Sequence, residues 1–127
     1  MSLRARLRSF RFAFAGLATL VRTQPNARIH AVATVAVIAL GLLLRLTAAE
    51  WCWIALAITA VWVAEALNTS LEFLADATCP DIHPLVKQSK DVAAAAVLIA
   101  AVGAAVIGAL VFGPRAWAVI GGGTMIY

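Results

Sequence analysis

Three apolar stretches, over residues 29–46, 51–74 and 92–113, dominate this sequence of 127 residues. A helix that crosses a lipid bilayer needs about 20 predominantly apolar residues, and each stretch approaches or exceeds that length. A small soluble protein could hide one such helix but not three. Only 13% of the residues are charged, whereas soluble domains carry roughly 25%. We therefore predict an all-α integral membrane protein, with residues 1–127 forming a single membrane domain.

The segment before the first stretch has a different pattern, which is typical of a helix lying on a membrane surface. Apolar side chains repeat at helical spacing along one stripe, and most arginines fall beside it within an arc of roughly 80°. The stripe consists of Leu3, Leu7, Phe10, Phe14, Leu17 and Val21, and the arginines are Arg4, Arg8, Arg11 and Arg22. We predict an amphipathic surface helix within residues 1–25. A targeting extension is the alternative, which the continuation of the pattern up to the first span disfavours.

The basic residues predict how the chain is oriented in the membrane. Eight of them lie before the first span or between the second and third, at Arg4, Arg6, Arg8, Arg11, Arg22, Arg28, Lys87 and Lys90. Only Arg45 and Arg115 lie on the other side. Because basic residues accumulate on the cytoplasmic side, we expect a multi-pass protein of the inner (cytoplasmic) membrane with its N-terminus in the cytoplasm.

A stripe of polar residues within the second span is the first candidate for chemistry. Glu65, Asn68, Glu72 and Asp76 stand at helical spacing, within about 80° of each other. Glu65 lies about 21 Å into the span at 1.5 Å per residue. A carboxylate there costs at least about 2.5–3.5 kcal/mol, which is usually tolerated for function or for a buried partner. An interhelical hydrogen bond or ion pair is the alternative, but four polar groups on one stripe favour a functional site.

A second polar cluster begins the third predicted helix, at His83, Lys87, Lys90 and Asp91. A helix N-terminus with two lysines attracts phosphate groups, although the lysines could instead anchor the helix to anionic headgroups. Carboxylates that face lysines at a membrane surface indicate a metal–phosphate site. Glu72 and Asp76 offer the oxygen ligands that Mg²⁺ prefers, and Glu65 could act as a base toward a lipid hydroxyl.

These residues together resemble the prokaryotic diacylglycerol kinase family. Its pattern EALNTAIE…D…H…AKD…AAV is matched by Glu65-Ala-Leu-Asn68-Thr-Ser-Leu-Glu72, Asp76, His83 and Lys90-Asp91-Val-Ala-Ala-Ala-Ala-Val. Asn26-Ala-Arg28-Ile-His30 resembles the family's N-x-R-I-H before the first span. The resemblance runs from about Phe10 to Phe112.

The resemblance implies a homotrimer of three-span subunits that transfers the γ-phosphate of ATP to a lipid hydroxyl, with Mg²⁺ and with active sites shared between neighbouring subunits. It implies Glu65 as the catalytic base and Glu72 as a metal ligand. It implies nucleotide or substrate contacts for Asn68, Asp76, Lys90 and Asp91, and a position near the nucleotide for His83. The expected partners are therefore ATP, a membrane lipid and further copies of the chain, and no nucleic acid.

Three positions depart from the family pattern, and all three remove polar groups on the ATP side. Gln24 replaces a metal-binding glutamate, while Phe12 and Ala15 replace a tyrosine and a lysine. Gln24 can still offer its amide oxygen to a metal, but without charge. These changes indicate weaker nucleotide binding, a different donor, or a catalytically inactive relative that serves as a small membrane interaction protein.

The family divides by acceptor lipid into a diacylglycerol branch and an undecaprenol branch. Arg28-Ile29-His30, His83-Pro84-Leu85 and the residues after Asp91 look closer to the undecaprenol branch. We therefore expect undecaprenol as the acceptor, with diacylglycerol as the alternative.

Overall fold

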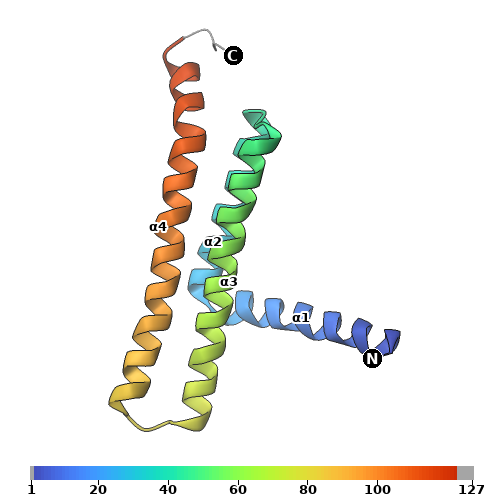
Figure 1. Cartoon of the computed structure of the whole chain (residues 1–127), viewed down its shortest axis with the longest axis vertical. Coiled ribbons are helices and arrows are strands. Elements are labelled where there is room, and N and C mark those ends of the chain that lie inside the picture. The colour runs from blue at the N-terminus through green and yellow to red at the C-terminus, as the bar shows by residue number, and fades with distance from the viewer. Residues whose placement is uncertain (1, 123–127) are drawn as a thin grey trace.

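The computed structural model describes residues 2–122, which form four α-helices (Figure 1). Their bounds are α1 Leu3–Thr23, α2 Pro25–Leu43, α3 Ala48–Thr78 and α4 Pro84–Ile120. By length and composition, α2, α3 and α4 can each cross a membrane. The prediction of an all-helical protein with three candidate membrane-spanning helices is thus confirmed.

The helices α3 and α4 extend beyond the predicted ranges 51–74 and 92–113 at both ends, whereas α2 ends before the predicted range 29–46 does. This helix begins earlier, at Pro25, and ends at Leu43, so residues 44–46 of the predicted span 29–46 belong to the connection between α2 and α3, with a turn at residues 44 and 45. Arg45 has a φ of 54° there, in the left-handed region that ends a helix. Thr47 then starts α3 with a capping box, because its hydroxyl accepts from the Glu50 N–H at 3.2 Å and the Glu50 carboxylate accepts from the Thr47 N–H at 3.1 Å.

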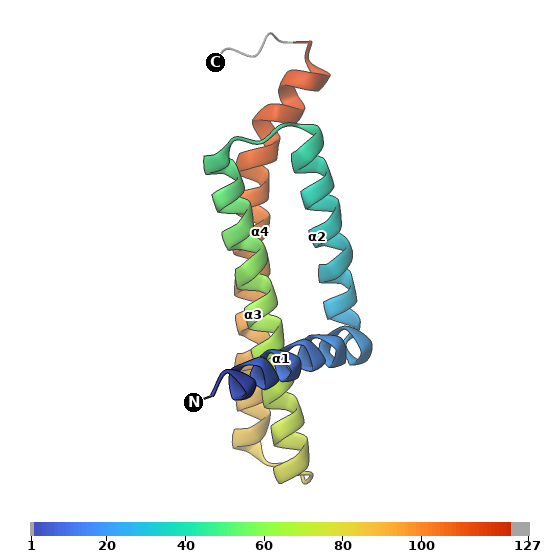
Figure 2. The same cartoon turned by 90° about the vertical axis from the view of Figure 1, so that its right-hand side faces the viewer.

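The three long helices share little fully buried surface. α3 and α4 lie side by side along their length, whereas α2 contacts α3 and stands apart from α4 (Figures 1 and 2). The buried apolar side chains are Leu20, Ala27, Leu46, Ile54, Ala57 and Val61. Within the described part of the chain, α4 has no fully buried residue. So much exposed apolar surface is untypical of a soluble monomer and suits a protein surrounded by lipid or by further copies.

Arginine side chains hold the two connections around α2. At the junction of α1 and α2, Arg28 donates from Nε to the carbonyl oxygen of Val21 at 3.0 Å and from Nη2 to that of Arg22. These are terminal carbonyls of α1, which a cation stabilises. At the opposite end, Arg115 of α4 pairs with Glu50 and donates to the carbonyl oxygen of Leu44 at 2.7 Å. Two of the arginines counted for orientation therefore also shape the fold.

α1 runs roughly across the bundle, and its crossing point defines a level on α3 (Figure 2). There, a cavity of about 410 Å³ separates α1 from α3 and is lined on the α3 side by Ala66, Thr69, Ser70 and Phe73. The hairpin of α3 and α4 continues well past this level to the 79–83 loop (Figure 1). Along α3, Glu65 therefore lies on the side of the α1 crossing nearer the connection to α2, and Asp76 lies on the side nearer the 79–83 loop.

Candidate functional site

Glu65 is a buried carboxylate in a largely apolar protein. Its side chain is only 2% exposed, and it lines a cavity of about 290 Å³ between α2, α3 and α4 together with Asn26, His30 and Asn68. The remaining lining is apolar and consists of Ile29, Ala94, Val97, Leu98 and Ala101. Oε2 of Glu65 and Oδ1 of Asn68 have no hydrogen-bond partner among the described residues. Buried acceptors are rarely left unpaired, so this cavity suits a ligand that brings a donor such as a hydroxyl group.

His30 and Asn26 are the polar residues of this cavity that the sequence did not single out as site residues. Nε2 of His30 lies 3.6 Å from Oε2 of Glu65, just outside hydrogen-bond distance. In the sequence, His30 stands out only as part of the N-x-R-I-H segment, because it lies far from Glu65 in the chain. The signal that could have identified it is its place on the first turns of α2, at the same depth as Glu65.

The charged residues of the hairpin form two ion pairs beyond the α1 crossing. Lys90 of α4 lies 2.8 Å from Asp76 of α3, measured from Nζ to Oδ1, and so links the two helices. Lys87 pairs with Asp91 one turn further along α4, at 2.7 Å. Exposed pairs of this kind contribute at most about 1 kcal/mol to stability. Their main effect is to place two lysines and two carboxylates on one accessible surface.

His83 is the N-cap of α4, and Pro84 occupies the first helical position. The imidazole Nδ1 accepts a hydrogen bond from the backbone N–H of Leu85 at 3.2 Å. This cap explains how the helix starts, and it leaves the rest of the exposed ring free to meet a ligand.

The predicted metal ligands do not form a complete site within one chain. Glu72 is partly exposed on α3, between Asn68 and Asp76 along the helix. Gln24 lies at the junction of α1 and α2, where its amide nitrogen donates to the hydroxyl of Thr23 at 3.2 Å. Across residues 2–122, no three histidine, cysteine or acidic side chains are grouped closely enough to hold a metal ion. Glu72 and Asp76 have the right chemistry for Mg²⁺ but need further ligands, such as phosphate oxygens.

The two other departures from the family pattern lie on α1. Phe12 is 66% exposed, and Ala15 is also exposed. Neither lines the cavity that holds Glu65. These two positions therefore lie outside the lining of the cavity around the buried carboxylate.

Comparison with known proteins decides the family. A model of the family described as prokaryotic diacylglycerol kinase matches residues 11–112. The chain belongs to the prokaryotic diacylglycerol kinase family. This confirms the resemblance seen in the sequence, and membership indicates a lipid kinase, a phosphotransferase that acts on an alcohol group.

Two curated relatives of this chain are named after different acceptor lipids. The chain is 40% identical over 108 residues to undecaprenol kinase of Bacillus subtilis, and the match covers 85% of this chain and 88% of that protein. It is 45% identical over 97 residues to diacylglycerol kinase of Synechocystis, and this match covers 76% of this chain but only 55% of that protein. The chain thus spans about half the length of the second relative.

Proposed function

We propose that this chain transfers the γ-phosphate of ATP to the hydroxyl group of undecaprenol. The observation that carries the proposal is the cavity around Glu65, in which a buried carboxylate presents an unpartnered oxygen beside the equally unpartnered Oδ1 of Asn68. The nearly full-length match to an undecaprenol kinase supports this acceptor. The match to a diacylglycerol kinase is shorter relative to that protein, which makes diacylglycerol the alternative.

The proposed mechanism is general-base catalysis by Glu65. The acceptor hydroxyl donates its hydrogen bond to Oε2 of Glu65, and the carboxylate takes the proton as the hydroxyl oxygen bonds to the γ-phosphorus. The bond from that phosphorus to the leaving oxygen of ADP breaks in the same step. A positioned base of this kind typically contributes 10²–10⁴-fold to a rate. Asn68 holds the hydroxyl or the adjacent phosphate from the same cavity wall.

The nucleotide is proposed to lie against the hairpin surface, beyond the level of α1. Lys90 and Lys87 bind phosphate oxygens there, exchanging part of their contacts with Asp76 and Asp91. His83 lies at the edge of this surface, at the start of α4. Mg²⁺, when bound, offsets phosphate charge. Its protein ligands would be Glu72, with Asp76 beside it, and Gln24 as a neutral oxygen donor.

We infer that α1 lies in the cytoplasmic interface of the inner membrane, as predicted for residues 1–25. Its apolar stripe is largely exposed, with Leu3 at 73% and Phe14 at 69%. Its orientation across the bundle supports an interface at the level where α1 meets α3 (Figure 2). The parts within the bilayer are proposed to fall within residues 29–46, 51–74 and 92–113 of one membrane domain. The nucleotide surface then faces cytosolic ATP.

Cysteine labelling tests this orientation. In a Cys52→Ala background, we expect a membrane-impermeant maleimide to miss Cys79 in intact spheroplasts and to label it after permeabilisation, because the 79–83 loop faces the cytoplasm. In a second variant that also carries Cys79→Ala, Ala49→Cys provides a thiol at the other end of α3 and should react without permeabilisation. Labelling of Cys79 alone in intact spheroplasts would reverse the topology and remove access to cytosolic ATP.

We propose a homotrimer as the working assembly. Within the described part of the chain α4 has no fully buried residue, and its small residues Ala96, Ala100, Ala104 and Gly108 repeat every four positions, with Ala104 and Gly108 lining the cavity toward α2 and α3. In lipid, such a face lets helices approach closely. A second copy could also complete the ligand set around Glu72, which the single chain leaves unfilled.

The decisive experiment is a phosphorylation assay with purified protein in lipid vesicles. With ATP and Mg²⁺, we expect undecaprenol to be phosphorylated faster than diacylglycerol, and no product to form without an added acceptor. Faster phosphorylation of diacylglycerol would change the acceptor and keep the kinase. Failure with both lipids would favour the second candidate, an inactive relative acting through membrane interactions, which the substitutions at Gln24, Phe12 and Ala15 support.

A further inference from the structure

Two cross-links join α2 to α3 on neighbouring helical turns, and one of them involves Glu65. In the first, Nε1 of Trp62 on α3 donates to the hydroxyl of Thr34 on α2 at 3.0 Å. In the second, Nε2 of His30 on α2 approaches Oε2 of Glu65 on α3 to 3.6 Å. Along each helix the two members are three or four residues apart, so the links lie one above the other.

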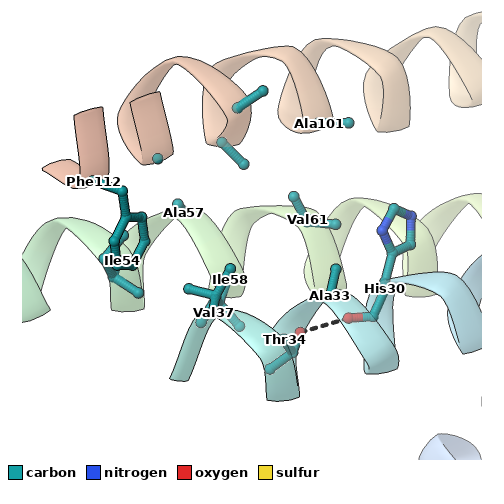
Figure 3. Close-up of a pocket in the computed structure, with 13 residues that line it drawn as sticks. His30, Ala33, Thr34, Val37, Ile54, Ala57, Ile58, Val61, Ala101 and Phe112 are labelled. Carbon is teal, nitrogen blue, oxygen red and sulfur yellow. Dashed lines mark hydrogen bonds between the residues drawn. The ribbon is translucent and has the colours of Figure 1, made fainter. Parts of the chain in front are cut away.

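Thr34 connects the two cross-links. Its hydroxyl accepts from Trp62. It also donates to the backbone carbonyl oxygen of His30 at 2.7 Å (Figure 3). Both functions of the hydroxyl are therefore used. Because α2 meets α3 along a limited contact and stands apart from α4, the Trp62–Thr34 bond is an important constraint on how far α2 can slide or turn.

His30 also stands where two cavities meet. The first is the cavity of about 290 Å³ that contains Glu65 and Asn68. The second, of about 300 Å³, extends from His30 along α2, α3 and α4 toward Phe112, and Thr34 is its only other polar lining residue in the described part of the chain (Figure 3). His30 and Ala101 line both cavities. The imidazole is thus the polar group that separates the second, largely apolar cavity from the carboxylate of Glu65.

We propose that His30 is a positioning residue for Glu65, held in register by Trp62 and Thr34. The Nε2–H group of His30 donates to Oε2 of Glu65, which can accept from both His30 and the acceptor hydroxyl, so that the carboxylate keeps a single orientation toward the cavity. The present separation of 3.6 Å shortens to a hydrogen bond when an acceptor hydroxyl enters, as catalytic contacts commonly do. This inference rests on the proposed function, in which Glu65 is the base.

Substitution of His30 distinguishes positioning from packing. His30→Leu keeps an apolar side chain of similar bulk but has no donor, whereas His30→Gln places an amide N–H near the position of Nε2. We expect His30→Leu to lower kcat about tenfold with little change in KM for ATP, since a catalytic group misplaced by 1 Å can cost about 10²-fold. His30→Gln should recover most of kcat. Equal losses in both variants would assign His30 to packing and overturn the proposal.

Trp62→Phe tests the register, because it removes the Nε1 donor and keeps an aromatic ring. We expect a smaller fall in kcat than in His30→Leu, again with an unchanged KM for ATP. Trp53→Phe is the matched control, since Trp53 is 56% exposed on the same helix and lines neither cavity. A loss in Trp53→Phe equal to that in Trp62→Phe would remove Trp62 from the positioning chain.

Chemical labelling gives a readout that does not need kinase activity. Dicyclohexylcarbodiimide modifies protonated carboxyl groups in apolar surroundings, and mass spectrometry can locate the product on Glu65. Without the Nε2–H donor the carboxylate is no longer held in one orientation and meets the reagent more readily, so His30→Leu should label several times faster than wild type and His30→Gln should not. Unchanged labelling in His30→Leu would overturn the contact. A wild type without phosphorylation of any lipid would instead contradict the proposed function, and the labelling rates would still decide the role of His30.

Discussion

Glu65→Gln is expected to lower the rate of lipid phosphorylation by about 10²-fold or more, the scale of losing a general base. Glutamine has nearly the same shape as glutamate, but its amide cannot accept the proton of the acceptor hydroxyl at neutral pH. The side chain is 2% exposed in a preformed cavity, so the substitution should leave the fold and the oligomer intact. The measurement is the initial rate of ATP-dependent phosphorylation in vesicles, together with the oligomer size in detergent.

Glu50→Gln is the matched control, because it makes the same chemical change at the other end of the same helix. Glu50 pairs with Arg115 and caps α3, so the control should lose thermal stability and keep its turnover. Full turnover in a well-folded Glu65→Gln protein would leave Glu65 with a structural role only. The His30 contact would then be an interhelical link without catalytic consequence.

Glu72→Gln is expected to raise the Mg²⁺ concentration for half-maximal activity at least about tenfold. Even residues that only support metal ligands typically cost 10–100-fold in affinity, and Glu72 is proposed to be a ligand itself. The described residues offer no cluster that could replace it. A Mg²⁺ titration at saturating ATP measures the change, and Asp81→Asn, in the exposed 79–83 loop, is the control for loss of one negative charge on the same side. An unchanged requirement in Glu72→Gln would exclude Glu72 from the metal site.

Gln24→Glu is tested in the same Mg²⁺ titration and makes the opposite change, because it adds a negative charge to the proposed metal site. It adds the charge that the family usually has at this position, so the Mg²⁺ requirement should fall and turnover should not. Activity that appears only in Gln24→Glu would identify the wild type as an inactive relative. Activity that disappears in Gln24→Glu would show that Gln24 serves a different donor or reaction. The metal ligands that the family pattern implies would then be wrong for this chain.

Local physics made much of this protein predictable from its sequence. Hydrocarbon admits only long apolar helices with internally satisfied backbones, so runs of apolar residues were sufficient to predict three spanning helices. The period of the helix was sufficient to place Glu65, Asn68, Glu72 and Asp76 on one stripe. The EALN…E…D motif supplied the family, which the comparison confirmed. None of these inferences required knowledge of how one helix packs on another.

The tertiary structure decided which groups meet across helices. Lys90 pairs with Asp76 on α3, and its sequence neighbour Asp91 pairs with Lys87. His30 reaches Glu65 from another helix, and Arg28 and Arg115 bind backbone carbonyls at the two connections of α2. Such contacts depend on the depth and rotation of each helix relative to its neighbours. Helical periodicity sets which residues share a face, but only side-chain packing sets which face of the next helix they meet.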